Sequence, residues 1–333
     1  MVKRSKVLVI RFSSIGDIVL TSPVVRCLKK VCGNQMEVHF ATKKSFKDLL
    51  SSNPYIDKLH LLDGKLSDFN RKLRAENYDH IIDLHYNTRS AIIKWALRKP
   101  ASSFNKLNVE KWLMVNLKIN RLPQLHIVDR YFEAVRKLGV FNDGEGLDFF
   151  LPESVEADES LVPSTIGERY IAFAIGGQHT TKRLPNEKII SVINKLPLPV
   201  VLLGGEDDVQ NAVIISSQCG EKVFNGCGKL SILQSALLVK KAAVVVTHDT
   251  GLMHIAAAFN KPIVSVWGNT VTDFGMYPYM PKYPERSKIV QVDHLPCRPC
   301  SKIGFSECPK SHFDCMVKID EGEIVMSVKR MLG

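Results

Sequence analysis

Short apolar runs alternate with amphipathic segments along the whole chain, which is typical of a sequence that alternates strand and helix. Runs rich in Val, Ile and Leu predict buried strands near residues 6–11, 36–41, 57–62, 80–84, 169–175, 199–203, 243–247 and 262–267. Strands that alternate with helices form parallel sheets that are covered on both faces. The pattern therefore predicts an α/β protein.

One stretch in the middle of the chain interrupts this alternation. Residues 142–168 include Gly144, Gly146, Pro152 and Pro163 and an acidic run from Glu153 to Glu159, a composition typical of a linker. We therefore expect two domains, at residues 1–155 and 165–315, followed by a C-terminal segment, residues 316–333, with a helix from Glu321 to Met331. Each domain then begins with its own strand, loop and helix.

The first strand ends in a loop of small and polar residues. Ser13, Ser14 and Gly16 lie in this loop, and Asp17 begins a segment that predicts a helix to about Val31. Such residues at the carboxyl end of a first parallel strand mark the place where open α/β sheets bind ligands. Asp17 is the one carboxylate there, and it is either a functional group or a helix cap.

A second strand, loop and helix occupies residues 245–258. The first turn of the predicted helix carries Thr250, Gly251 and His254. A helix N-terminus presents unpaired N–H groups and a partial positive charge, so it can bind a phosphate. The alternative is an ordinary turn in which Asp249 or Thr250 is the N-cap.

Taken together, these segments resemble glycosyltransferase family 9, the lipopolysaccharide heptosyltransferases. The matching segments are RFSSIGDIVLTSP at 11–23, KRLP at 182–185, LLGGE at 202–206, DTGLMHIAAA at 249–258 and KPIVSVWG at 261–268. They occur in the family's order, and the resemblance covers nearly the whole chain. It implies a GT-B fold, in which two Rossmann-like domains face each other across a cleft and the C-terminal helix packs back on the N-terminal domain.

The resemblance also implies an activity. It indicates an inverting transferase that moves a heptose from ADP-heptose to a lipid-linked, anionic saccharide of the lipopolysaccharide core. Asp17 would be the general base, and Ser13, Ser14 and Gly16 would form the loop on the acceptor side. The remaining residues would bind the nucleotide sugar: Lys182, Glu206, Asp249, Thr250, Gly251 and His254.

The resemblance assigns separate roles to these donor-binding residues. Asp249 would hold sugar hydroxyls, while Thr250, Gly251 and His254 would bind the diphosphate. Lys182 would pair with phosphate or sugar, and Glu206 would contact the ribose or the base.

Other nucleotide-binding classes lack support in the sequence. No G-x-G-x-x-G motif follows Ile10 or Ile175, and residues 225–230 end in Leu where a P-loop has Ser or Thr. No Asp-x-Asp motif is present to hold a metal and diphosphate, so we expect transfer without a metal or other cofactor. A nucleotide-sugar epimerase or hydrolase of the same fold, a transferase that uses another nucleotide sugar, and a non-catalytic nucleotide-sugar-binding protein remain as alternatives.

Charge is distributed unevenly along the chain. The formal net charge is +11, but residues 1–140 contain 26 Lys and Arg against 12 Asp and Glu. This excess indicates either a surface for an anionic partner, such as a membrane, or solvated helix faces. No nucleic-acid module is recognisable. No apolar run approaches the roughly 18 residues of a membrane span, so we expect a cytoplasmic protein, peripheral on the inner face of the membrane.

Four of the eight cysteines are clustered near the C-terminus. Cys297, Cys300, Cys308 and Cys315 follow the pattern C-x2-C-x7-C-x6-C. Four thiolates at short spacing can form a tetrahedral zinc site. Free thiols, or a disulfide that forms on oxidation, are the alternatives, and in each case we expect a structural role.

Overall fold

The computed structural model describes residues 5–156, 158, 161 and 166–333. The chain divides into a first unit, Met1–Lys106 with Leu125–Phe150, and a second unit, Leu107–Gln124 with Leu151–Gly333. The described helices include none that is both long and apolar enough to cross a bilayer.

The segment 107–124, which was expected in the first domain, groups with the second unit. Hydrogen bonds from two of its residues explain this grouping. Lys118 donates to the carbonyl groups of Cys297 and Pro299, and Asn120 donates to Asp273. The domain limits at 1–155 and 165–315 stay predictions.

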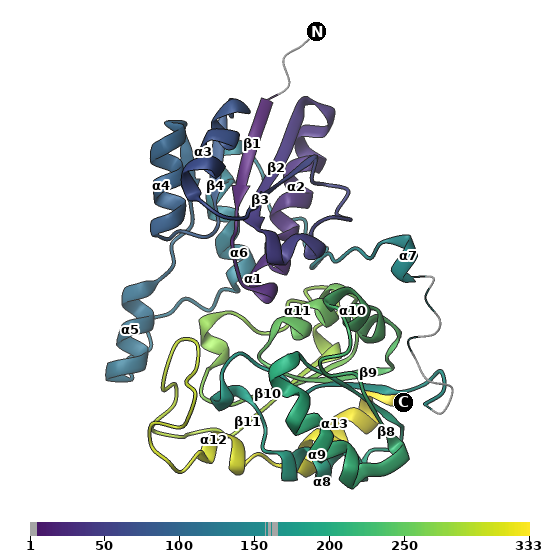
Figure 1. Cartoon of the computed structure of the whole chain (residues 1–333). Helices are drawn as coiled ribbons and strands as arrows, with labels where there is room; N and C mark the ends of the chain where they lie inside the picture. Colours follow the sequence, from purple (N-terminus) through teal and green to yellow (C-terminus); the bar gives the residue numbers. More distant parts are fainter. Residues whose placement is uncertain (1–4, 157, 159–160, 162–165) are drawn as a thin grey trace. The chain divides into compact units, whose positions relative to one another are not determined.

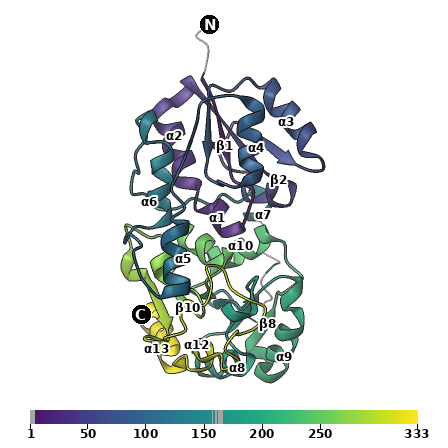
Figure 2. The same cartoon turned by 90° about the vertical axis from the view of Figure 1, so that its left-hand side faces the viewer.

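The first unit contains a parallel sheet in the order β3-β2-β1-β4-β5. Its strands are β1 (Ser5–Ile10), β2 (Met36–Lys43), β3 (Lys58–Leu62), β4 (His80–Asp83) and β5 (Ala101–Ser103). Its helices are α1 (Ile15–Val19), α2 (Ser22–Cys32), α3 (Leu66–Ala75), α4 (Thr88–Leu97) and α6 (Ile127–Tyr131). Figures 1 and 2 show α3 and α4 on one side of this sheet and α2 on the other.

Proline divides the predicted first helix in two. A single helix was expected from Asp17 to about Val31, but α1 ends at Val19 and α2 begins at Ser22. Pro23 has no N–H and would clash with a carbonyl group one turn earlier in a continuous helix. It is tolerated in the first turn of α2, where no intrahelical partner is needed.

The second unit contains a parallel sheet in the order β11-β10-β9-β6-β7-β8. Its strands are β6 (Ile171–Ala174), β7 (Val200–Leu203), β8 (Val223–Asn225), β9 (Val244–His248), β10 (Ile263–Trp267) and β11 (Ser287–Gln291). Its helices are α5 (Asn108–Leu117), α7 (Glu153–Glu156), α8 (Asn186–Lys195), α9 (Val209–Cys219), α10 (Ile232–Lys241), α11 (Gly251–Ala258), α12 (Asp314–Val317) and α13 (Glu321–Leu332). Within this unit, α10 and α11 cover one face of the sheet, and α8, α9 and α13 cover the other (Figure 1).

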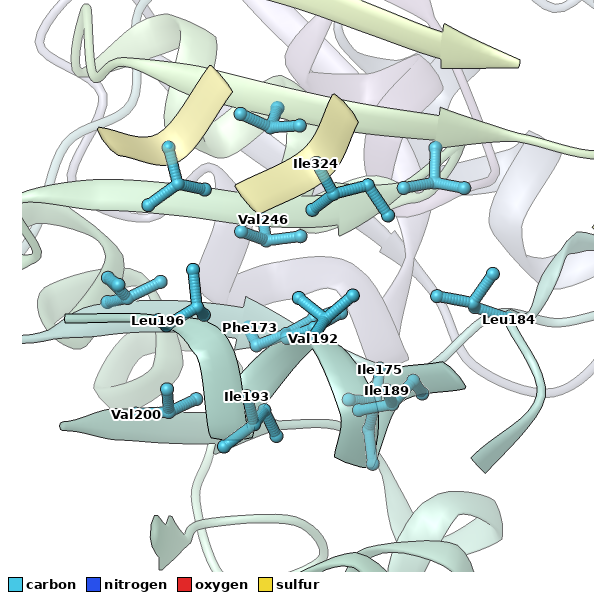
Figure 3. Close-up of a cluster of buried hydrophobic side chains, with 14 of the residues drawn as sticks. Phe173, Ile175, Leu184, Ile189, Val192, Ile193, Leu196, Val200, Val246 and Ile324 are labelled. Atoms are coloured by element: carbon cyan, nitrogen blue, oxygen red, sulfur yellow. The ribbon is translucent and has the colours of Figure 1, made fainter. Parts of the chain in front are cut away.

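The C-terminal helix packs on the core of the second unit. Ile324, Val325 and Val328 are buried in a cluster that also contains Phe173 and Val246. Figure 3 shows Ile324 close to Val246 of β9. The predicted packing of α13 on the first unit stays a prediction.

Candidate active site

In each sheet there is one pair of neighbouring strands from which the chain connections run in opposite directions. In the first sheet this switch point lies between β1 and β4, and in the second it lies between β6 and β9. Open α/β sheets bind ligands outside the carboxyl ends of the strands at such switch points. The segments that follow these four strands contain Asp17, His85, Gly176 and Asp249.

Asp17 is anchored at both of its carboxylate oxygens. The Ser14 backbone N–H and hydroxyl donate to Oδ2 at 3.1 and 3.0 Å, which forms a capping box at the start of α1. Oδ1 lies 2.5 Å from Nη2 of Arg11. Asp17 therefore does take part in a helix cap. Because its side chain is still 22% exposed, the carboxylate also remains accessible from solvent.

Arg11 connects the loops that follow β1 and β4. Its Nε donates to the Ser13 carbonyl at 2.8 Å, and its Nη1 donates to the Leu84 carbonyl at 2.5 Å. The guanidinium also lies 5.8 Å from the ring centroid of Tyr131. One buried cation therefore fixes Asp17 relative to the loop that carries His85.

Electrostatics keeps Asp17 ionised. Burial alone would raise the pKa of its carboxyl group, but the Arg11 guanidinium and the Ser14 donors outweigh this effect and hold the pKa below its usual value. An ionised carboxylate can accept a proton, so its charge state at neutral pH suits a general base.

His85 is presented by a turn that Asp83 shapes. The buried Asp83 carboxylate accepts the backbone N–H groups of His85 and Tyr86 at 3.1 and 2.7 Å, and Lys94 lies 2.8 Å from its other oxygen. The His85 ring packs edge-on against Phe12, with 5.6 Å between centroids. Burial lowers the pKa of His85 to about 4, so its ring is neutral at pH 7.

Replacement of Arg11 by Met is expected to raise the pKa of Asp17, because the nearest positive charge is lost. A base with a higher pKa becomes protonated at higher pH, so the acidic limb of the kcat/KM profile should move to higher pH. Arg11→Lys should move it less. If the Arg11→Met variant melts cooperatively and its pH profile of kcat/KM is unchanged, Arg11 does not control the pKa of Asp17. Among the described residues, His85 and Tyr131 are titratable groups that also interact with Asp17.

The second switch point brings together three side chains from separate segments. The Lys182 ammonium lies 2.5 Å from Asp249 Oδ2, and the Thr270 hydroxyl donates to the same oxygen at 2.9 Å. The side chains of Lys182 and Asp249 are 16% and 11% exposed. The two predicted residues therefore form an ion pair that retains some access to solvent, and Thr270 completes it.

The N-terminus of α11 lies directly after Asp249. Thr250 occupies the N-cap position, but its side chain makes no capping hydrogen bond, and its hydroxyl lies 3.4 Å from that of Thr247. The structure thus confirms the predicted strand, turn and helix, with Gly251 as the first helical residue. His254 is buried in the first turn. The proposed contacts of Thr250, Gly251 and His254 with diphosphate stay predictions.

Glu206 lies at the carboxyl end of β7, in the second unit. It is exposed and begins a 3-10 turn, Glu206–Asp208, that leads into α9. Asp208 accepts the Gly205 N–H at 2.9 Å and lies 3.2 Å from Nη1 of Arg183. The predicted contact of Glu206 with ribose or base stays untested.

His248, at the end of β9, has a structural role. Its Nε2 accepts the N–H of Leu184 at 3.0 Å, and its Nδ1 lies 3.3 Å from the Gly176 carbonyl. Burial lowers the pKa of His248 to about 4, so the ring is neutral. These bonds connect the loops after β6 and β9.

The four clustered cysteines do not form a closed metal site in the described part of the chain. A tetrahedral zinc site with bonds of about 2.3 Å requires sulfurs about 3.8 Å apart. No three of these sulfurs lie within 4.8 Å of one another among the described residues. The Cys300 thiol instead donates to the Cys297 carbonyl at 3.1 Å. A cavity of about 640 Å³ lies beside Cys297 and Cys300.

Another group of possible metal ligands lies in the first unit. His39, His60 and Glu76 offer ligand atoms within 4.8 Å of one another. However, Tyr78 lies 3.0 and 2.9 Å from the two imidazole nitrogens, and the Glu76 carboxylate is paired with Lys6 and Lys58. Two ammonium groups on the carboxylate would repel a cation, so we interpret the group as a hydrogen-bonded network.

The chain contains two Rossmann-like parallel sheets, each with polar residues at its switch point, which is the fold type of the GT-B class. The sequence profile of glycosyltransferase family 9 (heptosyltransferase) matches residues 66–310. The chain therefore belongs to glycosyltransferase family 9, as the sequence motifs indicated.

Individual relatives agree with this assignment. Lipopolysaccharide heptosyltransferase 1 of Campylobacter coli is 24% identical over 98% of this chain and 99% of that protein. A family 9 glycosyltransferase from Veillonella parvula superposes with a TM-score of 0.79 at 22% identity, covering 100% of this chain and 98% of that one. The E. coli heptosyltransferase WaaC, solved with ADP, gives a TM-score of 0.70 at 19% identity over 98% and 99% of the two chains. These structures confirm the α/β fold of two Rossmann-like domains.

Sequence reasoning missed two residues of the candidate site. Thr270 follows the predicted strand at 262–267, and the rule that ligands bind at the carboxyl ends of strands could have identified it. His85 likewise follows the predicted strand at 80–84. Nothing in the sequence, however, indicates that Arg11 bonds to Leu84, because this contact spans 73 positions along the chain.

Proposed function

We propose that the chain is an inverting glycosyltransferase that transfers a heptose from ADP-heptose to a lipid-linked, anionic saccharide of the lipopolysaccharide core. The observation that carries this proposal is the Lys182–Asp249 ion pair, in which Asp249 directly precedes the N-cap residue Thr250 of α11, whose side chain makes no capping hydrogen bond. Family membership supports the same reaction class.

The donor-binding residues contact different parts of the nucleotide sugar. The N–H groups at the start of α11, together with the Thr250 hydroxyl, hold the diphosphate, and Gly251 allows its close approach. Lys182 supplies a positive charge for the departing diphosphate. Asp249 accepts hydrogen bonds from sugar hydroxyls, while Glu206 contacts the ribose or the base.

Asp17 acts on the acceptor. It takes the proton of the acceptor hydroxyl as the hydroxyl oxygen attacks the anomeric carbon on the face opposite the diphosphate. The bond between the acceptor oxygen and the anomeric carbon forms, and the bond between the anomeric carbon and the phosphate oxygen breaks. The electron pair of the broken bond leaves with the ADP. The configuration at the anomeric carbon is therefore inverted in a single displacement.

The reaction so described needs no metal or other cofactor. Turnover in the presence of a chelator should equal turnover without it. The zinc hypothesis for Cys297, Cys300, Cys308 and Cys315 is separate, and elemental analysis of untagged protein tests it. One zinc per chain would support it, and the absence of stoichiometric metal would end it.

Calorimetric titration with a panel of nucleotide sugars tests the donor assignment. We expect ADP-heptose and ADP to bind, with ADP-heptose the tighter ligand because Asp249 contacts the sugar. The description of the WaaC structure with ADP supports the choice of base. Preference for a UDP-sugar would overturn the heptosyl assignment.

The basic N-terminal part of the chain is expected to bind anionic membranes in a salt-dependent way. Residues 1–140 carry a formal net charge of +14, and exposed charges are screened over about 8 Å at physiological salt. Co-sedimentation with anionic vesicles should therefore fall as salt rises, and neutral vesicles should bind little. Equal binding to both kinds of vesicle would contradict a peripheral location on the cytoplasmic membrane.

A further inference from the structure

The cysteine-rich segment, residues 295–316, is connected to the Lys182–Asp249 pair by two routes of hydrogen bonds. All of these contacts lie within the second unit. The segment was expected to be structural only, because none of the donor motifs includes it.

The first route passes through Arg298. Its Nε and Nη2 both donate to the Thr270 carbonyl, at 3.1 and 2.7 Å, and the Thr270 hydroxyl donates to Asp249. Arg298 is itself held by the Val292 carbonyl at 2.9 Å and by Gln291 Oε1 at 2.8 Å. A planar guanidinium can hold several acceptors in one fixed geometry. Arg298 therefore fixes the backbone of the residue that holds Asp249.

The second route passes through Phe305 and Thr181. The Phe305 N–H donates to the Thr181 hydroxyl at 2.8 Å, and the Thr181 N–H donates to the Phe305 carbonyl at 3.2 Å. Thr181 directly precedes Lys182, so these bonds fix the backbone from which the lysine extends. The two routes end on the two members of one ion pair.

Close packing gives these loops little freedom. A Cβ on Gly268 would lie 2.6 Å from the Thr181 carbonyl oxygen, and one on Gly304 would lie 2.5 Å from Cβ of His179. Next to Arg298, the segment is also held by Lys118, which donates to the carbonyls of Cys297 and Pro299 at 3.0 and 2.7 Å. The segment is thus held by Lys118, which directly follows α5, and it contacts the candidate donor site through Arg298 and Phe305.

We propose that the cysteine-rich segment is the positioning scaffold of the donor site, in which Arg298 orients Asp249 through Thr270, and Phe305 orients Lys182 through Thr181. This inference rests on the proposed donor role of Lys182 and Asp249. Arg298 is a positioning residue because it acts on the donor through Thr270.

A double-mutant cycle tests the first route. Arg298→Met should weaken ADP-heptose binding by roughly 2- to 150-fold, the usual range for directly coupled neighbours, and ADP binding less, because ADP lacks the sugar that Asp249 contacts. Thr270→Val should weaken binding similarly, because it removes the hydroxyl that holds Asp249. In the Thr270→Val background, Arg298→Met should cause little further loss of donor affinity, since the connection to Asp249 is already broken. If the two fold losses in donor affinity multiply in the double variant, Arg298 does not act through Thr270.

Two further readouts separate positioning from general stability. Arg298→Lys should restore part of the affinity, since it keeps one charged donor near the Thr270 carbonyl. Hydrogen exchange should accelerate in Arg298→Met at residues 269–271. Arg286→Met is the matched control, because Arg286 also donates to a backbone carbonyl of this unit, that of Asn260, and should leave donor affinity unchanged.

The result for Asp249→Asn separates this inference from the function on which it rests. If Asp249→Asn weakens donor binding and the folded Arg298→Met variant binds like the wild type, the scaffold is wrong and the donor site stands. If Asp249→Asn binds the donor normally, both are wrong.

Discussion

Replacement of Asp17 by Asn is expected to lower turnover by about 10²- to 10⁴-fold while donor affinity stays near that of the wild type. The loss corresponds to roughly 3 to 5 kcal/mol of activation free energy. Asn keeps the shape of the side chain and an oxygen that can accept from Ser14, but it cannot take a proton at neutral pH. Turnover with saturating donor and calorimetric donor binding, measured on one preparation, check the prediction.

Asp63→Asn provides the matched control for this variant. Asp63 is an exposed carboxylate of the same unit, paired with Lys44, and its replacement should change neither turnover nor donor affinity. Asp17→Asn also removes the charge that pairs with buried Arg11, so a modest drop in melting temperature is expected. Near-normal turnover of a folded Asp17→Asn protein would show that Asp17 only caps α1.

Replacement of Asp249 by Asn should have the opposite signature, with weaker donor binding as the main effect. A charged hydrogen-bonding group contributes about 1.5 to 3 kcal/mol, so we expect a loss of roughly 10- to 100-fold in affinity. Asn leaves one neutral acceptor for the sugar hydroxyls and releases the partners of Asp249, Lys182 and Thr270. Titration with ADP-heptose and with ADP separates the sugar contribution from that of the nucleotide.

Asp273→Asn is the corresponding control, since Asp273 is an exposed carboxylate of the same unit that accepts from Asn120. It should bind the donor normally. An Asp249→Asn variant that lost turnover without losing affinity would assign Asp249 to the chemical step and contradict its role in holding the sugar.

Much of the fold was predictable because parallel strands bury both faces. The eight predicted strands are all present. Three edge strands were missed: β5 and β8 have only three residues each, and β11 is partly exposed. Short or exposed edges do not produce the continuous apolar run that identifies a buried strand.

The candidate site was predictable only in part. Asp17 and Asp249 follow buried strands, so a local rule identified them. The partners that set their charge and orientation come from elsewhere: Leu84 lies 73 positions from Arg11, and Thr270 lies 21 positions from Asp249. No local pattern encodes such contacts, because they depend on which strands become neighbours in the sheet.

The most direct test of the proposed reaction is the product formed from ADP-heptose and a heptose-free lipopolysaccharide-core acceptor, analysed by mass spectrometry and by the anomeric configuration of the new linkage. We predict that the acceptor gains one heptosyl group, that ADP is released in equal amount, and that the configuration is opposite to that of the donor. Release of ADP with no gain by the acceptor, or a product that retains the donor configuration, would contradict the proposed function.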